Sequence, residues 1–175
     1  MMSERPRRVL LIGYGNPGRL DDGLGPALAT EVEQLDLPGV TVDSDYQLTV
    51  EDAAAIAQHD AVVFADAAVS GPEPFCFERI DPKPALSFSS HSVEPAAVLA
   101  LAEELFGSST PGYCLGIRGY EFNDYHERLS EQAQANLTAA VKFIVSAFQT
   151  GNFDEVAGEH RCASAVSCIA SSGDA

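Results

Sequence analysis

The first residues in the chain that could do chemistry are two adjacent carboxylates, Asp21 and Asp22, in a loop that reads GYGNPGRLDDGLG. One aspartate would suffice to cap the helix that we expect to start near Asp22, because the exposed amide groups of a helix N-terminus favour a carboxylate. A second carboxylate beside the first adds like-charge repulsion unless a cation or another partner offsets it. The pair therefore points to a cation or partner as well as to a cap.

Two further candidates, Asp66 and His91, are far from this loop in the sequence. Asp66 ends an apolar segment that we interpret as a buried strand, and His91 lies shortly before a predicted helix. In an open parallel sheet, the carboxyl ends of the strands and the N-termini of the helices share one edge, where ligands bind. We therefore expect Asp22, Asp66 and His91 at one edge, as a ligand set for a divalent transition metal with open positions. Alone, Asp66 could cap a turn and His91 could bond a backbone carbonyl.

The glycines of the first loop allow a second interpretation, a dinucleotide site. Gly13, Gly15 and Gly18 satisfy the G-x-G-x-x-G pattern after a predicted strand, and Asp43 or Asp45 could then receive a ribose hydroxyl. However, a proline at position 26 is acceptable only in the first turn of a helix, so the helix should start near residue 22. The two carboxylates then occupy the place of the phosphate, which disfavours a nucleotide.

A third interpretation starts from Gly15-Asn16-Pro17-Gly18, which resembles the opening of the peptidyl-tRNA hydrolases. That family continues with a stretch that contains a catalytic histidine, whereas this chain has Asp21 and Asp22 there. The formal charge of −16 is also unfavourable for an enzyme that holds tRNA.

Short apolar segments alternate with helical patterns along the chain, which predicts an α/β fold with a mainly parallel sheet and helices on its faces. We expect an edge strand at Phe75–Ile80, a helix capped by Ser92 and ended at Gly107, and a last helix capped by Ser130. The other expected strands are 8–13, 40–43, 61–66 and 113–117, and the expected helices are 24–35, 50–58, 93–106 and 129–148.

Composition bounds the class of protein. The chain has 175 residues, enough for one domain with a substantial core, and its apolar runs are too short for a membrane span. Its 26 acidic and 10 basic side chains make nucleic acid an unlikely partner, because binding phosphate backbones depends on Lys and Arg. The apolar run after the first arginines is too short for a signal peptide, so we expect a cytoplasmic protein.

In the cytoplasm, the four cysteines Cys76, Cys114, Cys162 and Cys168 are expected to remain thiols, the first two of them buried in strands. We expect one α/β domain over residues 1–150 and a mobile tail over 151–175, where Ala, Ser, Gly and Asp dominate. The spacing of His160 and the two tail cysteines fits no zinc template.

Taken together, the motifs resemble the [NiFe]-hydrogenase maturation proteases. The resemblance rests on Gly15-Asn16, on the DDGLG stretch at 21–25, on Ala65-Asp66-Ala67 and on Ser90-His91, and it covers roughly residues 8–150. The segments 46–48 (YQL) and 115–122 (LGIRGYEF) are also similar to members that serve cytosolic or uptake hydrogenases.

This resemblance implies a three-layer α/β/α fold of the phosphorylase/hydrolase type. It also implies an endopeptidase that removes a C-terminal extension from the hydrogenase large-subunit precursor after nickel insertion, and that acts as a monomer. The metal ligands of the family map onto Asp22, Asp66 and His91, with Asp21 as a neighbour. We expect these three residues to engage nickel that the precursor already holds, since a set without thiolates is too hard to retain nickel alone. The alternative is a module that binds a metal or a partner without cleaving it.

Overall fold

The computed structural model describes residues 5–85 and 93–162, and its centre is a five-stranded sheet with the order β2-β1-β3-β5-β4. Four strands run parallel: β1 (Val9–Tyr14), β2 (Val40–Asp45), β3 (Ala61–Ala68) and β5 (Gly112–Arg118). β4 (Phe75–Ile80) pairs antiparallel with β5 at one edge. The mainly parallel sheet and its edge strand are confirmed.

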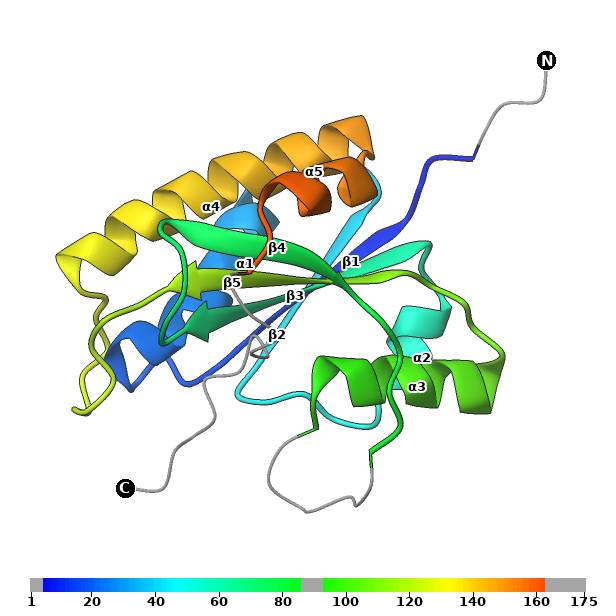
Figure 1. Cartoon of the computed structure of the whole chain (residues 1–175), viewed down its shortest axis with the longest axis horizontal. Coiled ribbons are helices and arrows are strands. Elements are labelled where there is room, and N and C mark those ends of the chain that lie inside the picture. Colours follow the sequence, from blue (N-terminus) through cyan, green and yellow to red (C-terminus); the bar gives the residue numbers. More distant parts are fainter. Residues whose placement is uncertain (1–4, 86–92, 163–175) are drawn as a thin grey trace.

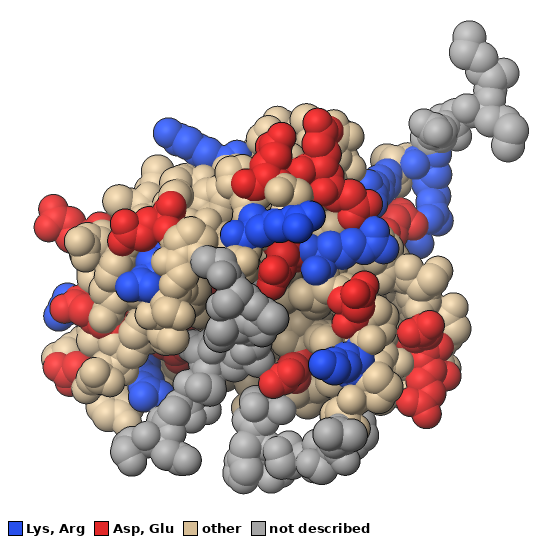
Figure 2. Space-filling model, viewed as in Figure 1, with Lys and Arg blue, Asp and Glu red and all other residues tan. Residues whose placement is uncertain are grey.

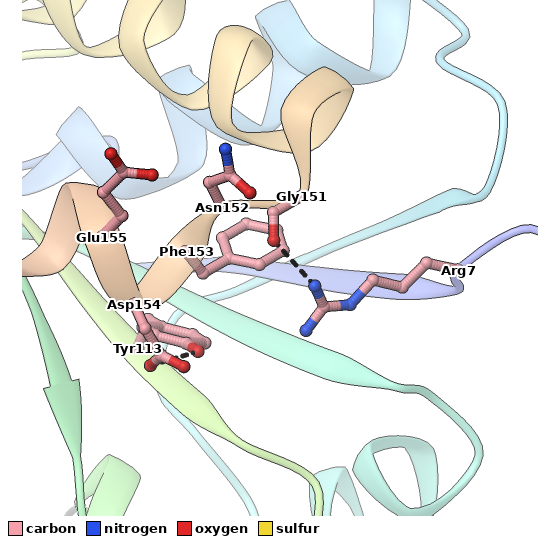
Figure 3. A pocket seen from close by; sticks show the side chains of 7 residues that line it. All are labelled: Arg7, Tyr113, Gly151, Asn152, Phe153, Asp154 and Glu155. Carbon is pink, nitrogen blue, oxygen red and sulfur yellow. Dashed lines mark hydrogen bonds between the residues drawn. The ribbon is translucent and has the colours of Figure 1, made fainter.

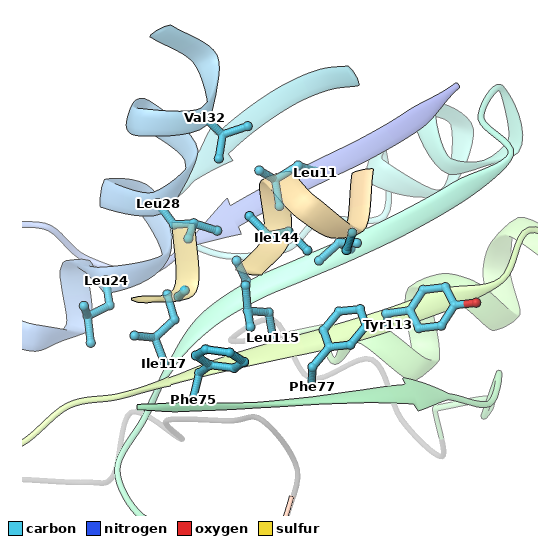
Figure 4. Close-up of a cluster of buried hydrophobic side chains, with 14 of the residues drawn as sticks. Leu11, Leu24, Leu28, Val32, Phe75, Phe77, Tyr113, Leu115, Ile117 and Ile144 are labelled. Atoms are coloured by element: carbon cyan, nitrogen blue, oxygen red, sulfur yellow. The ribbon is translucent and has the colours of Figure 1, made fainter. Parts of the chain in front are cut away.

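Helices cover both faces of this sheet, as Figure 1 shows. α1 (Leu24–Gln34) packs beside α4 (Glu131–Thr150), and α2 (Asp52–Ala57) packs beside α3 (Pro95–Phe106) on the other face. Successive strand residues point to opposite faces, so Leu11 joins the buried cluster under α1 and α4 (Figure 4), and Leu10 joins the cluster under α2 and α3. The expected three-layer α/β/α architecture is therefore confirmed.

The helix ends follow the expected signals with one exception. α3 ends at Gly107, which adopts the left-handed conformation, and the Ser130 hydroxyl accepts a hydrogen bond from the Ala133 N–H at the start of α4. The N-cap of α3 is Glu94 and not the expected Ser92, which lies outside the described residues. Proline 95 explains this start, because its fixed φ and missing N–H suit the first position of a helix.

The segment after α4 corrects the expectation of a tail without structure from about Gly151. α5 (Phe153–Glu159) follows a left-handed turn at Gly151, and Phe153 and Ala157 are buried against the sheet layer. The Phe153 ring lies 5.3 Å from the Tyr113 ring, centroid to centroid. In α5, the apolar residues Phe153, Val156 and Ala157 have helical spacing over a single turn only, and so short a helix depends on tertiary packing for its stability. Residues 163–175 lie outside the described part.

A disulfide between Cys76 and Cys162 corrects the expectation that all cysteines are thiols. The two residues are 86 positions apart in the chain, and their Cα atoms are 5.0 Å apart. They meet because the chain leaves α5 along the outer edge of β4, where the Phe77 N–H donates to the His160 carbonyl. Cys76 and Cys114 are buried, as expected, and Cys168 lies outside the described residues.

The charge of −16 is not gathered into one acidic field on the face shown in Figure 2, where Lys and Arg side chains lie among the Asp and Glu side chains. Within residues 5–85 and 93–162, no helix is both long enough and apolar enough to cross a bilayer.

Candidate active site

The two adjacent aspartates lie on a 3₁₀ turn, Leu20–Gly23, between β1 and α1, and their carboxyl groups have different surroundings. Asp21 is fully buried and accepts four hydrogen bonds: from the Ser130 N–H and hydroxyl at 2.7 Å each, from the Tyr120 N–H at 2.8 Å and from the Glu121 N–H at 2.9 Å. Burial alone would raise the pKa of Asp21, but these hydrogen bonds outweigh it and hold the pKa below its usual value. Asp21 is therefore a structural carboxylate.

The carboxyl group of Asp22 accepts fewer hydrogen bonds than that of Asp21. Within the described residues its carboxyl group accepts one hydrogen bond, from the Asn16 N–H to Oδ2 at 3.0 Å, and the side chain is partly exposed. Burial raises the pKa of Asp22, and neither that hydrogen bond nor the charge of Arg19 compensates fully. A carboxylate with spare oxygens and a raised pKa is suited to bind a cation or to accept a proton.

The glycines around this loop allow backbones to touch. A Cβ atom on Gly25 would lie 2.4 Å from the Tyr14 carbonyl oxygen and 2.5 Å from that of Ala65, so the first turn of α1 rests directly on β1 and β3. Gly15 has a φ of +139°, and a Cβ there would meet the Asp22 carbonyl oxygen at 2.1 Å. Close backbone packing therefore accounts for the glycines at positions 15 and 25.

Asp66 lies at the same edge of the sheet as this loop. It is 3% exposed, and it follows Ala65, whose register partner in β1 is Gly13. β3 continues to Ala68, so Asp66 is inside the strand and not at its last residue, as the sequence interpretation had placed it. Strands β1, β3 and β5 are parallel, so Asp66 and the turn that carries Asp22 both lie towards their carboxyl ends, as expected.

The third expected ligand, His91, lies outside the described residues. The described part of the chain continues from residue 93, shortly before α3. Within residues 5–85 and 93–162, no three His, Cys, Asp or Glu side chains gather closely enough to hold a metal ion. The set of Asp22, Asp66 and His91 therefore remains a prediction.

The connection from β5 to α4, residues 119–130, completes the wall of the site, and the sequence interpretation gave it no role. Besides the bonds to Asp21, the Arg19 guanidinium donates to the Phe122 carbonyl, and the Leu20 N–H donates to the His126 carbonyl. A Cβ on Gly119 would lie 2.9 Å from the Asp21 Cβ. This connection fixes the turn that presents Asp22. Two sequence signals pointed to it: the acidic pair, which needed a partner, and the resemblance of segment 115–122 to the maturation proteases.

Arg118 adds a positive group to the same edge. It is the last residue of β5, and its register partner is Ala68. Its guanidinium carbon lies 5.1 Å from the centre of the Tyr120 ring, and its buried Nε has no hydrogen-bond acceptor among the described residues. Asp66 pairs with Gly116, so the pleat directs the Asp66 and Arg118 side chains to the same face.

A pocket at the opposite edge of the sheet, near the amino ends of β1 and β5, is polar but internally paired (Figure 3). The Tyr113 hydroxyl donates to Asp154 at 2.9 Å, Arg79 donates to the same carboxylate at 3.0 Å, and Arg7 donates to the Gly151 carbonyl at 2.9 Å. Burial, then the bond to Asp154, raises the pKa of Tyr113 to about 12. These groups stabilise the start of α5 and leave little unused capacity.

Comparisons with known proteins give a match at the level of structure. Neither a protein-family model nor a curated protein matches the chain. Among solved structures, a [NiFe] hydrogenase maturation protease, HycI, from Thermococcus kodakarensis KOD1 is 24% identical, with a TM-score of 0.64 over 82% of this chain and 93% of its own. A hydrogenase 2 maturation peptidase from a Thaumarchaeota archaeon is 21% identical, with a TM-score of 0.60 over 82% and 99%. The hydrogenase maturating endopeptidase HybD from E. coli is 21% identical, with a TM-score of 0.61 over 84% and 95%.

The likeness spans most of this chain and nearly all of the three solved structures. The chain therefore has the fold of the [NiFe] hydrogenase maturation proteases, as its sequence motifs indicate.

Proposed function

We propose that this protein is an endopeptidase that removes the C-terminal extension of a [NiFe]-hydrogenase large-subunit precursor after nickel has been inserted. The observation that carries the proposal is the state of Asp22: a partly buried carboxylate with a raised pKa and spare oxygens, at the carboxyl edge of a sheet that also carries Asp66. The shared fold with maturation proteases supports the same function.

Each site residue has a proposed role. Asp22, Asp66 and His91 engage the nickel ion that the precursor presents, and nickel then belongs to the substrate and not to this protein. Oxygen and imidazole ligands alone bind nickel less selectively than thiolates do, which is consistent with a transient contact. Asp22 is also the better placed of the two adjacent aspartates to accept a proton from an attacking water, because its pKa is raised and its oxygens are not saturated.

Nickel in this arrangement serves as a check on the maturity of the precursor. A precursor without nickel offers the three ligands nothing to bind, so its scissile peptide is not held in place. With nickel present, the ion can also polarise the scissile carbonyl or a water molecule. We place this reaction in the cytoplasm, carried out by a monomer that meets the precursor transiently.

The decisive experiment compares two precursor preparations, one loaded with nickel and one without. Each is mixed with the purified protein, and the mass of the precursor's C-terminal region is followed by mass spectrometry. We expect shortening only with nickel. Efficient shortening of the nickel-free precursor would refute the maturity check, and binding without any shortening would favour a module that binds its partner without cleaving it.

A further inference from the structure

The segment His160–Cys162, which we call the strap, runs along the outer edge of β4. The Phe77 N–H of β4 donates to the His160 carbonyl at 2.7 Å, and the Cys162 N–H donates to the Glu78 carboxylate. The His160 ring packs 5.3 Å from the Phe75 ring and 4.8 Å from the Phe143 ring. The Cys76–Cys162 disulfide closes the strap. Two hydrogen bonds, two ring contacts and one disulfide therefore hold the strap against this edge.

The disulfide lies on the same face of the sheet as the Asp66 side chain. Cys76 pairs with Gly116 in β5, and Gly116 pairs with Asp66 in β3, so the three residues form one row across three strands. Side chains in such a row leave the sheet on the same face. Neighbouring strands are about 4.8 Å apart, which places the Cys76 backbone roughly 10 Å from that of Asp66. Gly116 contributes no side chain between them.

We propose that Cys76–Cys162 is a reversible redox site, through which a dithiol reductant releases the strap and opens the β4 edge beside the candidate site. The redox site is inferred from the contacts described above. Its effect on cleavage rests on the proposed function, because it requires that the protein is a protease. Disulfides in a reducing cytoplasm are usually transient and regulatory. The Cys76–Cys162 bond fits such a role because it closes only the short strap.

The reaction is a balanced exchange. A thiolate of the reductant attacks the Cys162 sulfur, because Cys162 is partly exposed whereas Cys76 is 5% exposed. The bond between the two protein sulfurs breaks, and Cys76 leaves as a thiolate that takes a proton from water. The second thiol of the reductant then attacks the mixed disulfide, releasing Cys162 as a thiol. The reductant ends as its own disulfide, and two electrons have passed to the protein.

Release of the strap has a defined structural consequence. The Phe77 N–H loses its carbonyl partner, and the edge of β4 can accept an extended peptide, as exposed strand edges do. The C-terminal extension of the hydrogenase precursor can then pair with the edge of β4, because the strap no longer occupies it. We therefore expect the reduced protein to be the faster protease.

The first test does not depend on protease activity. Protein purified without reductant is alkylated with iodoacetamide under native conditions, before and after treatment with dithiothreitol, and its mass is measured. We expect two more modified cysteines after reduction, and hydrogen exchange at the Phe77 amide, followed by NMR, at least roughly tenfold faster. Amides of the central strand β3 serve as the internal control. Modification of Cys76 and Cys162 before reduction, or unchanged exchange at Phe77 after it, would overturn the proposal.

The second test measures shortening of the nickel-loaded precursor by oxidised and reduced protein, after the reductant has been removed to protect the nickel. We expect kcat/KM to be roughly tenfold higher in the reduced state, about the value of one backbone hydrogen bond. The double variant C76S/C162S should match the reduced protein and ignore dithiothreitol, while C168S should respond like the unaltered chain. If the double variant does not fold, C162S replaces it.

The outcomes separate the two proposals. Equal cleavage rates in both states, with faster exchange at Phe77, would refute the regulation of the site. No cleavage in either state, with faster exchange, would refute the proposed function and support the redox strap.

Discussion

Both edges of the sheet carry polar side chains, but their hydrogen bonding differs. At the amino edge, Tyr113, Arg79 and Asp154 satisfy one another around the start of α5. At the carboxyl edge, Asp21 is saturated by four donors, yet its neighbour Asp22 accepts one hydrogen bond from the described residues.

This difference distinguishes polar groups that stabilise the fold from polar groups that are available to a ligand. Paired groups have already exchanged water for protein partners, so they contribute to stability and have little left to offer a ligand. An ionisable group that is partly buried and only partly satisfied costs stability, and such groups concentrate at functional sites. By this criterion the carboxyl edge is the candidate site, and the amino edge belongs to the scaffold.

The largest effect that we expect comes from Asp22→Asn. The amide keeps the size of the side chain but loses the charge that would engage a cation or take a proton, so kcat/KM for the nickel-loaded precursor should fall roughly a thousandfold, or about 4 kcal/mol. The readout is mass spectrometry of the precursor's C-terminus, together with circular dichroism of the variant. Glu33→Gln, the same chemical change at an exposed position of α1, is the matched control and should cleave normally. Normal cleavage by the Asp22 variant would remove this residue from the site.

Asp21→Asn should act on the fold instead. The new amide group would face the N–H groups of Tyr120, Glu121 and Ser130, leaving buried donors without an acceptor. We expect the free energy of unfolding to fall by about 3 kcal/mol. Urea denaturation at neutral pH measures it. A variant as stable as the unaltered chain would mean that Asp21 does not hold the connection at residues 119–130.

At the amino edge, Tyr113→Phe should be milder. It removes the hydroxyl that donates to Asp154, while Arg79 keeps that carboxylate paired. A loss of about 1 kcal/mol in unfolding free energy is expected, with cleavage of the precursor unchanged. Thermal melts and the same mass-spectrometric assay test both points. A strong loss of cleavage would contradict the assignment of this edge to the scaffold.

The smallest effect concerns the stability of Asp22→Asn and has the opposite sign to that of Asp21→Asn. Burial raises the pKa of Asp22 in the folded state, so ionisation destabilises the fold as pH rises through the unfolded and folded pKa values. The neutral amide avoids this cost, and stability at pH 7 should increase by a few tenths of a kcal/mol. For Asp21, whose pKa is lowered, the contribution is present above the unfolded pKa and is lost as pH falls through the folded one. Denaturation from pH 3 to 8 distinguishes these slopes.

Local signals predicted most of the framework. Buried apolar runs marked β1 and β3, the edge strand Phe75–Ile80 was placed at its observed bounds, and Ser130 and Gly107 acted as caps through their own side chain or backbone. Each of these features depends on residues a few positions apart. The acidic pair was also found, because two adjacent carboxylates need an explanation wherever they occur.

Features that depend on distant partners were not predicted. α5 needed the Tyr113 ring beneath Phe153, and the disulfide needed a chain path that brings Cys162 back to β4. One turn of helical spacing is too short to predict α5, and the disulfide leaves no local pattern. The metal-binding set predicted from the sequence, Asp22, Asp66 and His91, stays a prediction.

By itself, the sequence determined the type and order of the elements and the short list of residues able to do chemistry, since periodicity, caps and residue type are local properties. The family resemblance singled out Asp22 of the acidic pair, but only the tertiary structure shows why Asp21 is structural and Asp22 is available. Asp21 and Asp22 have the same side chain and adjacent positions, and their roles separate because Tyr120, Glu121 and Ser130, about 100 residues away, donate to one and not to the other. The pKa of a carboxyl group depends on burial and on donors, and both are set by the fold.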